Sequence, residues 1–227
     1  MQTVTAVGHR GDPYRFRENT ILSLRSALNQ GADAVEIDVR LTRDGVPVLL
    51  HDDSLKRLWG HDLPLRSLSA EEVRDLTAGG APTLVEALSA TEGSRVMVDL
   101  PGAPDPRSVR RIVDVIGECG ARDRVYYCAG AETMLAVRAA DSAAEIALTW
   151  TTLAPPRAAL LDAVRPRWLN CRFGLVDREL AARVHRDGML LSVWTPDTGR
   201  SLRRLIRLGA DSITTNRVGL LCTLRDR

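Results

Sequence analysis

Short runs rich in β-branched residues alternate along the chain with segments whose apolar residues recur every three or four positions. The runs predict eight strands, and spacings such as Ile21, Leu24 and Leu28 predict amphipathic helices between them. This alternation is typical of a parallel sheet covered by helices. The predicted strands are Val4–Gly8, Ala34–Leu41, Arg95–Leu100, Arg124–Cys128, Glu145–Trp150, Arg167–Cys171, Met189–Trp194 and Asp211–Thr215.

The number of repeats indicates a barrel. Eight strand–helix repeats within 227 residues match the small end of the range of (β/α)8 barrels. We therefore expect an α/β fold, a single (β/α)8 TIM barrel over residues 1–227. A doubly wound open sheet is the alternative. Its usual phosphate-binding pattern, GxGxxG after the first strand, is missing, because the chain reads Gly8-His-Arg-Gly11 there.

One segment interrupts the strand–helix alternation. After the second strand the chain reads Thr42-Arg-Asp-Gly45, and an apolar run leads from Val46 to His51. Asp-Gly between two apolar runs predicts a hairpin, so the chain turns back beside the second strand and carries His51 to the barrel mouth. We expect a short excursion over about residues 46–80 with one helix near Ala70–Leu76.

Composition narrows the class of protein. A formal net charge of only +2 gives no sign of a nucleic-acid surface. The chain has no uncharged apolar run of about 18 residues, so stable membrane insertion is not expected. Its start lacks the pattern of a signal peptide, and its four scattered cysteines suggest reduced thiols. These features predict a cytoplasmic protein with a small-molecule partner, and they leave its oligomeric state open.

Three carboxylates are predicted to meet at the barrel mouth, where parallel strands end. Glu36 and Asp38 lie two residues apart on one strand, so they share its inward face at a Cα separation of about 6.6 Å. Asp99 ends a neighbouring strand. Carboxylates crowded together favour one hard divalent cation, Mg²⁺ or Ca²⁺. The alternative is a structural ion pair between Glu36 and an arginine.

Two histidines, His9 and His51, stand at the same predicted mouth. A single histidine is more often a core residue, but two of them across a substrate suit acid–base catalysis. Arg10 offers a guanidinium fork for a phosphate, and Glu18 is placed both to stabilise the start of the first helix and to face the site. A metal, an arginine and two histidines around an anion suggest cleavage of a phosphate ester.

These residues resemble the glycerophosphodiester phosphodiesterase family in order and spacing. The resemblance implies a barrel that hydrolyses glycerophosphodiesters to glycerol 3-phosphate and an alcohol. It also implies His9 and His51 as the acid–base pair, phosphate contacts from Arg10, substrate contacts from Glu18 and Trp194, and metal ligation by Glu36, Asp38 and Asp99. The matching segments are Gly8–Gly11, Glu18–Thr20, Gly31–Val39, Thr42–Val48, His51-Asp52, Pro82–Leu88, Val193–Thr195 and Gly209–Asn216.

The chain departs from the family pattern at several positions. Where the family has Glu-x-Lys, this chain has Asp99-Leu-Pro101. The family's lysine, which reaches the phosphate, is therefore missing. Arg172 is a candidate to supply the lost positive charge. Family Asn and Asp near the end of the barrel are Asp197 and Asn216. Two other functions therefore stay open. One is a phospholipase D-like activity on lysolipids, which would need an apolar lip at the barrel mouth, and Leu58 and Trp59 are the only hint of such a lip. The other is a divergent barrel that binds a phosphorylated ligand with little or altered catalysis.

Overall fold

The computed structural model describes residues 4–226. Its strands are β1 (Thr5–His9), β2 (Ala34–Leu41), β3 (Pro47–Leu49), β4 (Arg95–Asp99), β5 (Val125–Ala129), β6 (Glu145–Trp150), β7 (Trp168–Arg172), β8 (Leu190–Trp194) and β9 (Ser212–Thr215). Its α-helices are α1 (Ile21–Asn29), α2 (Lys56–Trp59), α3 (Ala70–Leu76), α4 (Leu84–Ala90), α5 (Pro106–Glu118), α6 (Ala131–Ala140), α7 (Ala158–Val164), α8 (Arg178–Arg186), α9 (Gly199–Leu208) and α10 (Val218–Arg225).

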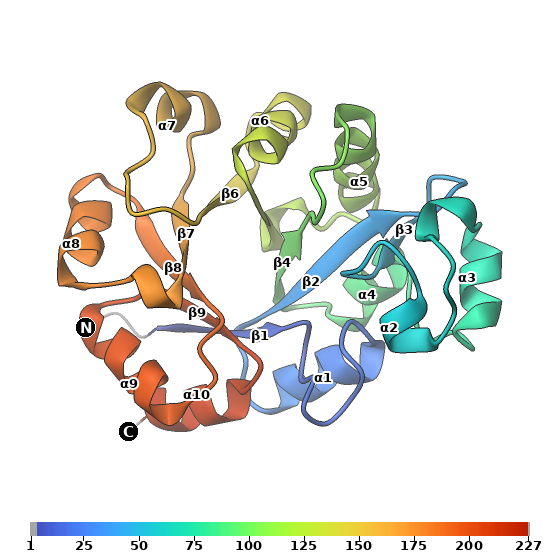
Figure 1. Ribbon diagram of the computed structural model, residues 1–227, viewed down its shortest axis with the longest axis horizontal. Helices are drawn as coiled ribbons and strands as arrows, with labels where there is room; N and C mark the ends of the chain where they lie inside the picture. The colour runs from blue at the N-terminus through green and yellow to red at the C-terminus, as the bar shows by residue number, and fades with distance from the viewer. Residues whose placement is uncertain (1–3, 227) are drawn as a thin grey trace.

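The parallel strands close into a barrel, as the sequence predicts (Figure 1). They follow the order β1-β9-β8-β7-β6-β5-β4-β2, and pairing of β1 with β2 completes the ring. Two of the eight predicted strands have the expected bounds, and the other six differ by one residue at one or both ends. The open-sheet alternative is therefore wrong.

Side-chain alternation along the strands builds two apolar layers. Val35, Ile37 and Val39 of β2 point outward and belong to the large cluster between the strands and the surrounding helices. Met97 and Tyr126 belong to a separate cluster, which lies inside the ring because their strand neighbours face the helices. Both faces of each strand are thus buried, and polar side chains are left for the ends of the ring.

The excursion after β2 contains the predicted hairpin. Strand β3 pairs antiparallel with β2, outside the ring, and α2 and α3 lie beside it (Figure 1). The expectation of a single helix near Ala70–Leu76 is wrong in one respect, because α2 and a 3-10 turn at Leu65–Ser67 precede α3. Neither is long enough to show a helical period in the sequence.

The excursion has a small apolar core of its own, formed by Val48, Leu50, Leu55, Leu65, Leu68, Val73 and Ala81. Leu58 and Trp59 pack against this core, and the Arg17 guanidinium lies 4.2 Å from the centre of the Trp59 ring. The two side chains that hinted at an apolar lip are therefore packing residues. Within residues 4–226, no helix combines the length and the hydropathy that crossing a bilayer requires.

Candidate active site

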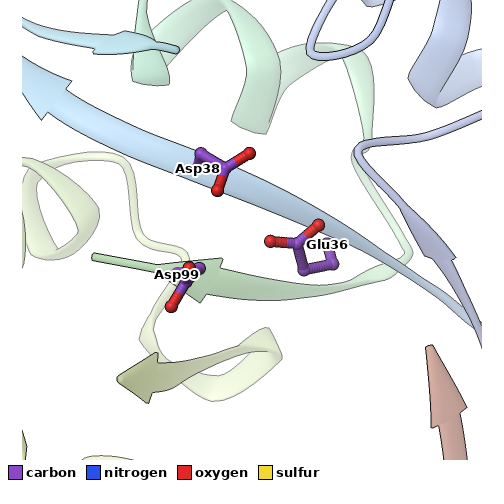
Figure 2. A group of neighbouring side chains, drawn as sticks. All are labelled: Glu36, Asp38 and Asp99. Atoms are coloured by element: carbon purple, nitrogen blue, oxygen red, sulfur yellow. The ribbon is translucent and has the colours of Figure 1, made fainter. Parts of the chain in front are cut away.

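Three acidic side chains converge, two from the middle of β2 and one from the end of β4 (Figure 2). The register of the two strands sets Asp38 beside Asp99, and Glu36 lies two residues before Asp38 on the same inward face. One carboxylate oxygen from each residue lies within 4.8 Å of the other two. Glu36 and Asp38 are only 4% and 1% exposed. The predicted cluster is thus assembled by strand register and not by proximity in the sequence.

The three acidic side chains of this cluster outnumber the positively charged groups beside them. Burial, together with the charges of Asp38 and Asp99, raises the pKa of Glu36 well above its ordinary value. Burial and the Asp38 charge also raise the pKa of Asp99 to about 7. Three oxygen donors that cannot all ionise at low cost suit a hard divalent cation such as Mg²⁺ or Ca²⁺. The residues present therefore fit the metal that the sequence suggests.

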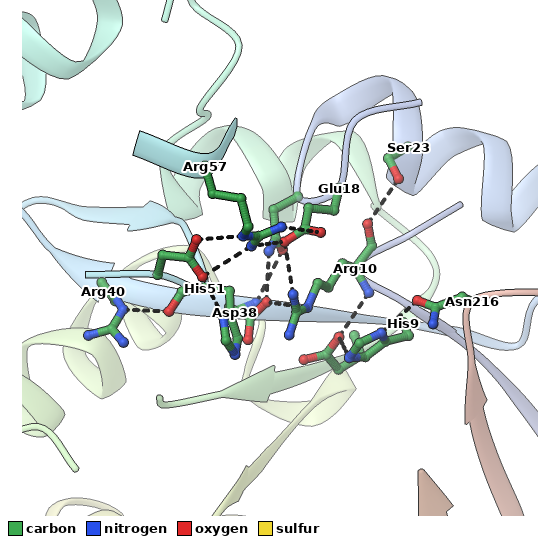
Figure 3. A network of polar contacts seen from close by, with 12 residues as sticks. His9, Arg10, Glu18, Ser23, Asp38, Arg40, His51, Arg57 and Asn216 are labelled. Atoms are coloured by element: carbon green, nitrogen blue, oxygen red, sulfur yellow. Dashed lines mark hydrogen bonds and ion pairs between the residues drawn. The ribbon is translucent and has the colours of Figure 1, made fainter. Parts of the chain in front are cut away.

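Arg10 follows β1 and meets this cluster from one side (Figure 3). Its backbone adopts a positive φ of 56°, its amide donates to Glu36 Oε2 at 2.8 Å, and its Nε lies 3.0 Å from Asp38 Oδ2. The structural ion pair that the sequence allowed is therefore present, but at Asp38. Because Arg10 is one cation among three acids, it leaves part of their charge uncompensated.

Asn19 is a further contact of the acidic cluster. It also has a positive φ, 57°, and its Nδ2 donates to Asp38 Oδ2 at 2.7 Å while its Oδ1 accepts from the Asp38 amide. The N-cap of α1 is Thr20, whose hydroxyl accepts from the Ser23 amide. The structure leaves Asn19 free to orient a candidate metal ligand.

A chain of charged contacts joins the β1 loop to the excursion (Figure 3). Glu18 accepts from Arg10 Nη1 at 2.8 Å and from Arg57 Nη2 at 2.7 Å. Arg57 Nε donates to Asp52 Oδ2 at 2.6 Å, and Asp52 Oδ1 lies 2.8 Å from His51 Nδ1. Hydrogen bonds from Arg57 lower the pKa of Asp52 to about 2. The excursion is thereby tied to the site through paired charges.

The two histidines have different surroundings. His9 Nδ1 lies 2.8 Å from Asn216 Oδ1, and its Nε2 lies 4.0 Å from Glu36 Oε2. Burial, and then the Arg10 charge, lowers the pKa of His9 below its ordinary value. The His51 side chain is 41% exposed and contacts the Asp52 carboxylate, while its backbone oxygen accepts from Arg40 Nε at 2.8 Å.

A cavity of about 490 Å³ opens at this end of the barrel. Most of the predicted site residues line it: His9, Arg10, Glu36, His51, Asp99 and Trp194. Asp38 lies beneath the surface, and Glu18 stands behind Arg10 as the partner of two arginines, so neither is among the described residues that line the cavity. A ligand in the cavity would meet both histidines, one guanidinium and the acidic cluster.

Two arginines near the site were not predicted from the sequence. Arg40 lies on the inward face of β2, two residues after Asp38, so the same alternation could have identified it. A side chain at Gly102, next to Pro101, would meet Arg40 Nη1 at 3.1 Å. Arg57 gave no signal, because its partner Glu18 is 39 residues away. Arg172 is exposed at the end of β7 and is not among the described residues lining the cavity.

Comparison with known proteins shows to which family the chain is related. The family model described as the glycerophosphoryl diester phosphodiesterase family matches residues 9–220. The chain belongs to this family. A probable glycerophosphodiester phosphodiesterase 2 of Mycobacterium tuberculosis is 31% identical, covering 95% of this chain and 88% of the relative. A glycerophosphodiester phosphodiesterase of Caldanaerobacter subterraneus is 26% identical, covering 92% of this chain and 93% of the relative.

Solved structures of similar fold agree with the barrel of this chain. That of the Thermotoga maritima enzyme superposes with a TM-score of 0.86 at 22% identity, over 99% of both chains. An Oleispira antarctica phosphodiesterase, solved in complex with the product sn-glycerol-3-phosphate, also gives a TM-score of 0.86 at 22% identity, over 99% of this chain and 98% of that chain. Family membership makes the chain a phosphoric diester hydrolase.

Proposed function

We propose that the chain hydrolyses glycerophosphodiesters to glycerol 3-phosphate and an alcohol, with one divalent cation and a pair of histidines. The observation that supports this proposal best is that His9 and His51 line the same cavity as Glu36 and Asp99. Phosphodiester cleavage requires acid–base groups and a cation site that act on the same phosphate group. The product complex of the Oleispira antarctica relative supports the same substrate class.

Glu36, Asp38 and Asp99 would hold the cation, Mg²⁺ or Ca²⁺. When bound, it neutralises phosphoryl charge as a Lewis acid. Arg10 contributes a fixed positive charge, because Glu18 and Asp38 hold its Nη1 and Nε and leave Nη2 without a described partner in residues 4–226. That nitrogen suits a phosphoryl oxygen. Trp194 forms part of the wall against which the rest of the substrate would pack.

The surroundings of the two histidines favour different roles. His9 is buried beside the Arg10 cation, which favours its neutral form, so it is suited to accept the proton of the attacking water. The Asp52 carboxylate contacts His51 Nδ1 and so orients the ring, which leaves Nε2 to face a leaving oxygen. We therefore assign His9 as the general base and His51 as the general acid that protonates the leaving alcohol.

A coupled assay for glycerol 3-phosphate tests the proposal. Glycerophosphocholine, glycerophosphoethanolamine, glycerophosphoglycerol and glycerophosphoinositol are offered with Mg²⁺ or Ca²⁺, and at least one is expected to release glycerol 3-phosphate. The Glu36→Gln variant is the control for contaminating enzymes. Release of choline from lysophosphatidylcholine, with all four diesters inert, would favour the lysolipid activity instead. Binding of glycerol 3-phosphate without any turnover would favour the divergent barrel.

The raised pKa of Asp99 predicts how stability changes with pH in the absence of metal. Between the ordinary value of 3.8 and about 7, the folded protein binds a proton that the unfolded chain has lost. The free energy of unfolding therefore falls as pH rises through this range, by on the order of 4 kcal/mol at most. Because asparagine cannot ionise, Asp99→Asn should gain stability over the wild type in EDTA as pH rises.

Urea unfolding at pH 5 and pH 8 in EDTA measures this difference. The advantage of Asp99→Asn is expected to be larger at pH 8, and addition of Mg²⁺ or Ca²⁺ at pH 8 should stabilise the wild type more than the variant. Asp62→Asn is the matched control, because Asp62 is an exposed aspartate of the excursion. An advantage that does not change between the two pH values would contradict the prediction.

A further inference from the structure

The loops after β8 and β9 form a hydrogen-bonded pair that ends on His9. Asp197 Oδ2 accepts from Asn216 Nδ2 at 2.7 Å, and Asp197 Oδ1 accepts from the Asn216 backbone amide at 2.9 Å. On its other side, Asn216 Oδ1 lies 2.8 Å from His9 Nδ1 (Figure 3). The two substitutions that appear as separate departures in the sequence are therefore in direct contact.

The chemistry of this pair determines where the proton of His9 lies. An ionised carboxylate can only accept hydrogen bonds, so the Asn216 side chain must turn its NH₂ group toward Asp197 and its carbonyl oxygen toward His9. A carbonyl oxygen also only accepts. The neutral His9 ring must therefore carry its hydrogen on Nδ1, and Nε2, which lies 4.0 Å from Glu36 Oε2, keeps a free lone pair.

We propose that Asp197 is a positioning residue that acts through Asn216 to hold His9 in the tautomer with hydrogen on Nδ1. The inference rests on the proposed function for its catalytic consequence, because only this tautomer lets Nε2 accept a proton in the cavity. Without a charged neighbour, the Asn216 amide could present either of its faces to His9. Asp197 itself is fixed by the Asn216 amide and by the hydroxyl of Thr215, a residue that is 0% exposed.

The variant Asp197→Asn removes the group that orients Asn216. An asparagine at 197 can accept or donate, so the Asn216 amide can turn and the His9 tautomer becomes mixed. We expect kcat for glycerophosphodiester hydrolysis to fall roughly 10- to 100-fold, with KM little changed, because substrate contacts are untouched. Asp211→Asn is the matched control, since Asp211 contacts His185 at 2.7 Å outside the cavity.

The double variant Asp197→Asn/Asn216→Asp separates positioning from mere structural support. In it the carboxylate at position 216 accepts directly from His9 Nδ1, and the asparagine at 197 donates to that carboxylate, so the same tautomer is restored. We expect kcat to recover most of what the single variant loses. A double variant as slow as Asp197→Asn, or slower, would overturn the proposal.

Nitrogen NMR of the imidazole rings tests the tautomer without any substrate. The chain has only four histidines, and the spectrum of His9→Gln identifies the His9 signals. The wild type, in the presence of Mg²⁺, is expected to carry hydrogen on Nδ1 of His9, and Asp197→Asn should show both tautomers. Hydrogen on Nε2 of the wild-type ring, or an unchanged tautomer in the variant, refutes the inference. Because this readout does not need turnover, its failure is distinguishable from failure of the proposed activity.

Discussion

Replacing His51 by alanine is expected to lower kcat for glycerophosphodiester hydrolysis by roughly 10²- to 10⁴-fold, the range of a lost acid–base group. The fold should survive, because the side chain is 41% exposed and the bond to Arg40 uses the backbone oxygen of His51. Steady-state kinetics with glycerophosphocholine measure the loss, and circular dichroism checks the fold. His61→Ala, in the same excursion, is the control, since its ring contacts a backbone oxygen, that of Leu76.

A substrate with a different leaving group tests directly whether His51 acts as the general acid. A p-nitrophenyl ester of glycerol 3-phosphate releases a stable phenolate that needs no proton from the enzyme. If His51 is the general acid, His51→Ala should lose much less activity on this ester than on glycerophosphocholine, whereas His9→Ala should lose activity on both. An equal loss on the two substrates would remove His51 from the role of acid, and an unchanged rate on both would remove it from the mechanism.

Removal of divalent cations is expected to reduce hydrolysis to background. Without a cation, the raised pKa values of Glu36 and Asp99 favour their protonated forms, and the Glu36–Asp38–Asp99 cluster holds no positive charge that could neutralise the phosphoryl oxygens of a substrate. Turnover is measured in excess EDTA and again after Mg²⁺ or Ca²⁺ is restored. EDTA already saturated with Ca²⁺ is the control for effects of the chelator itself. Undiminished turnover in excess EDTA would exclude a metal role.

Much of the site could be predicted because its residues follow patterns within short segments of the chain. The two-residue spacing of Glu36 and Asp38 puts them on one face of a strand whatever the rest of the fold does. The Asp44-Gly45 turn identified the hairpin that carries His51 back toward the ring. The length of the excursion elements could not be predicted, because a four-residue helix such as α2 depends on packing against the small core beneath it.

The charged network around the site lay beyond sequence reasoning. Arg57 joins Glu18 to Asp52 across 39 residues, and no periodicity relates such positions. Substrate contact by Glu18 stays a prediction, and the bonds from its carboxylate to two arginines could not be foreseen from the sequence. Asp197 and Asn216 were visible only as two isolated departures from a family pattern. Their contact follows from the adjacency of β8 and β9 at the end of the barrel.

The barrel, its hairpin excursion, the charged residues at its mouth and the family resemblance could all be predicted from the amino-acid sequence, because hydrophobic period, turn chemistry and motif spacing are properties of short segments. The folded structure was needed to show which charges neutralise one another, which acids outnumber their partners, and which face of Asn216 meets His9. Those outcomes depend on strand register and on burial, which bring together groups far apart in the chain and make their interactions strong enough to matter.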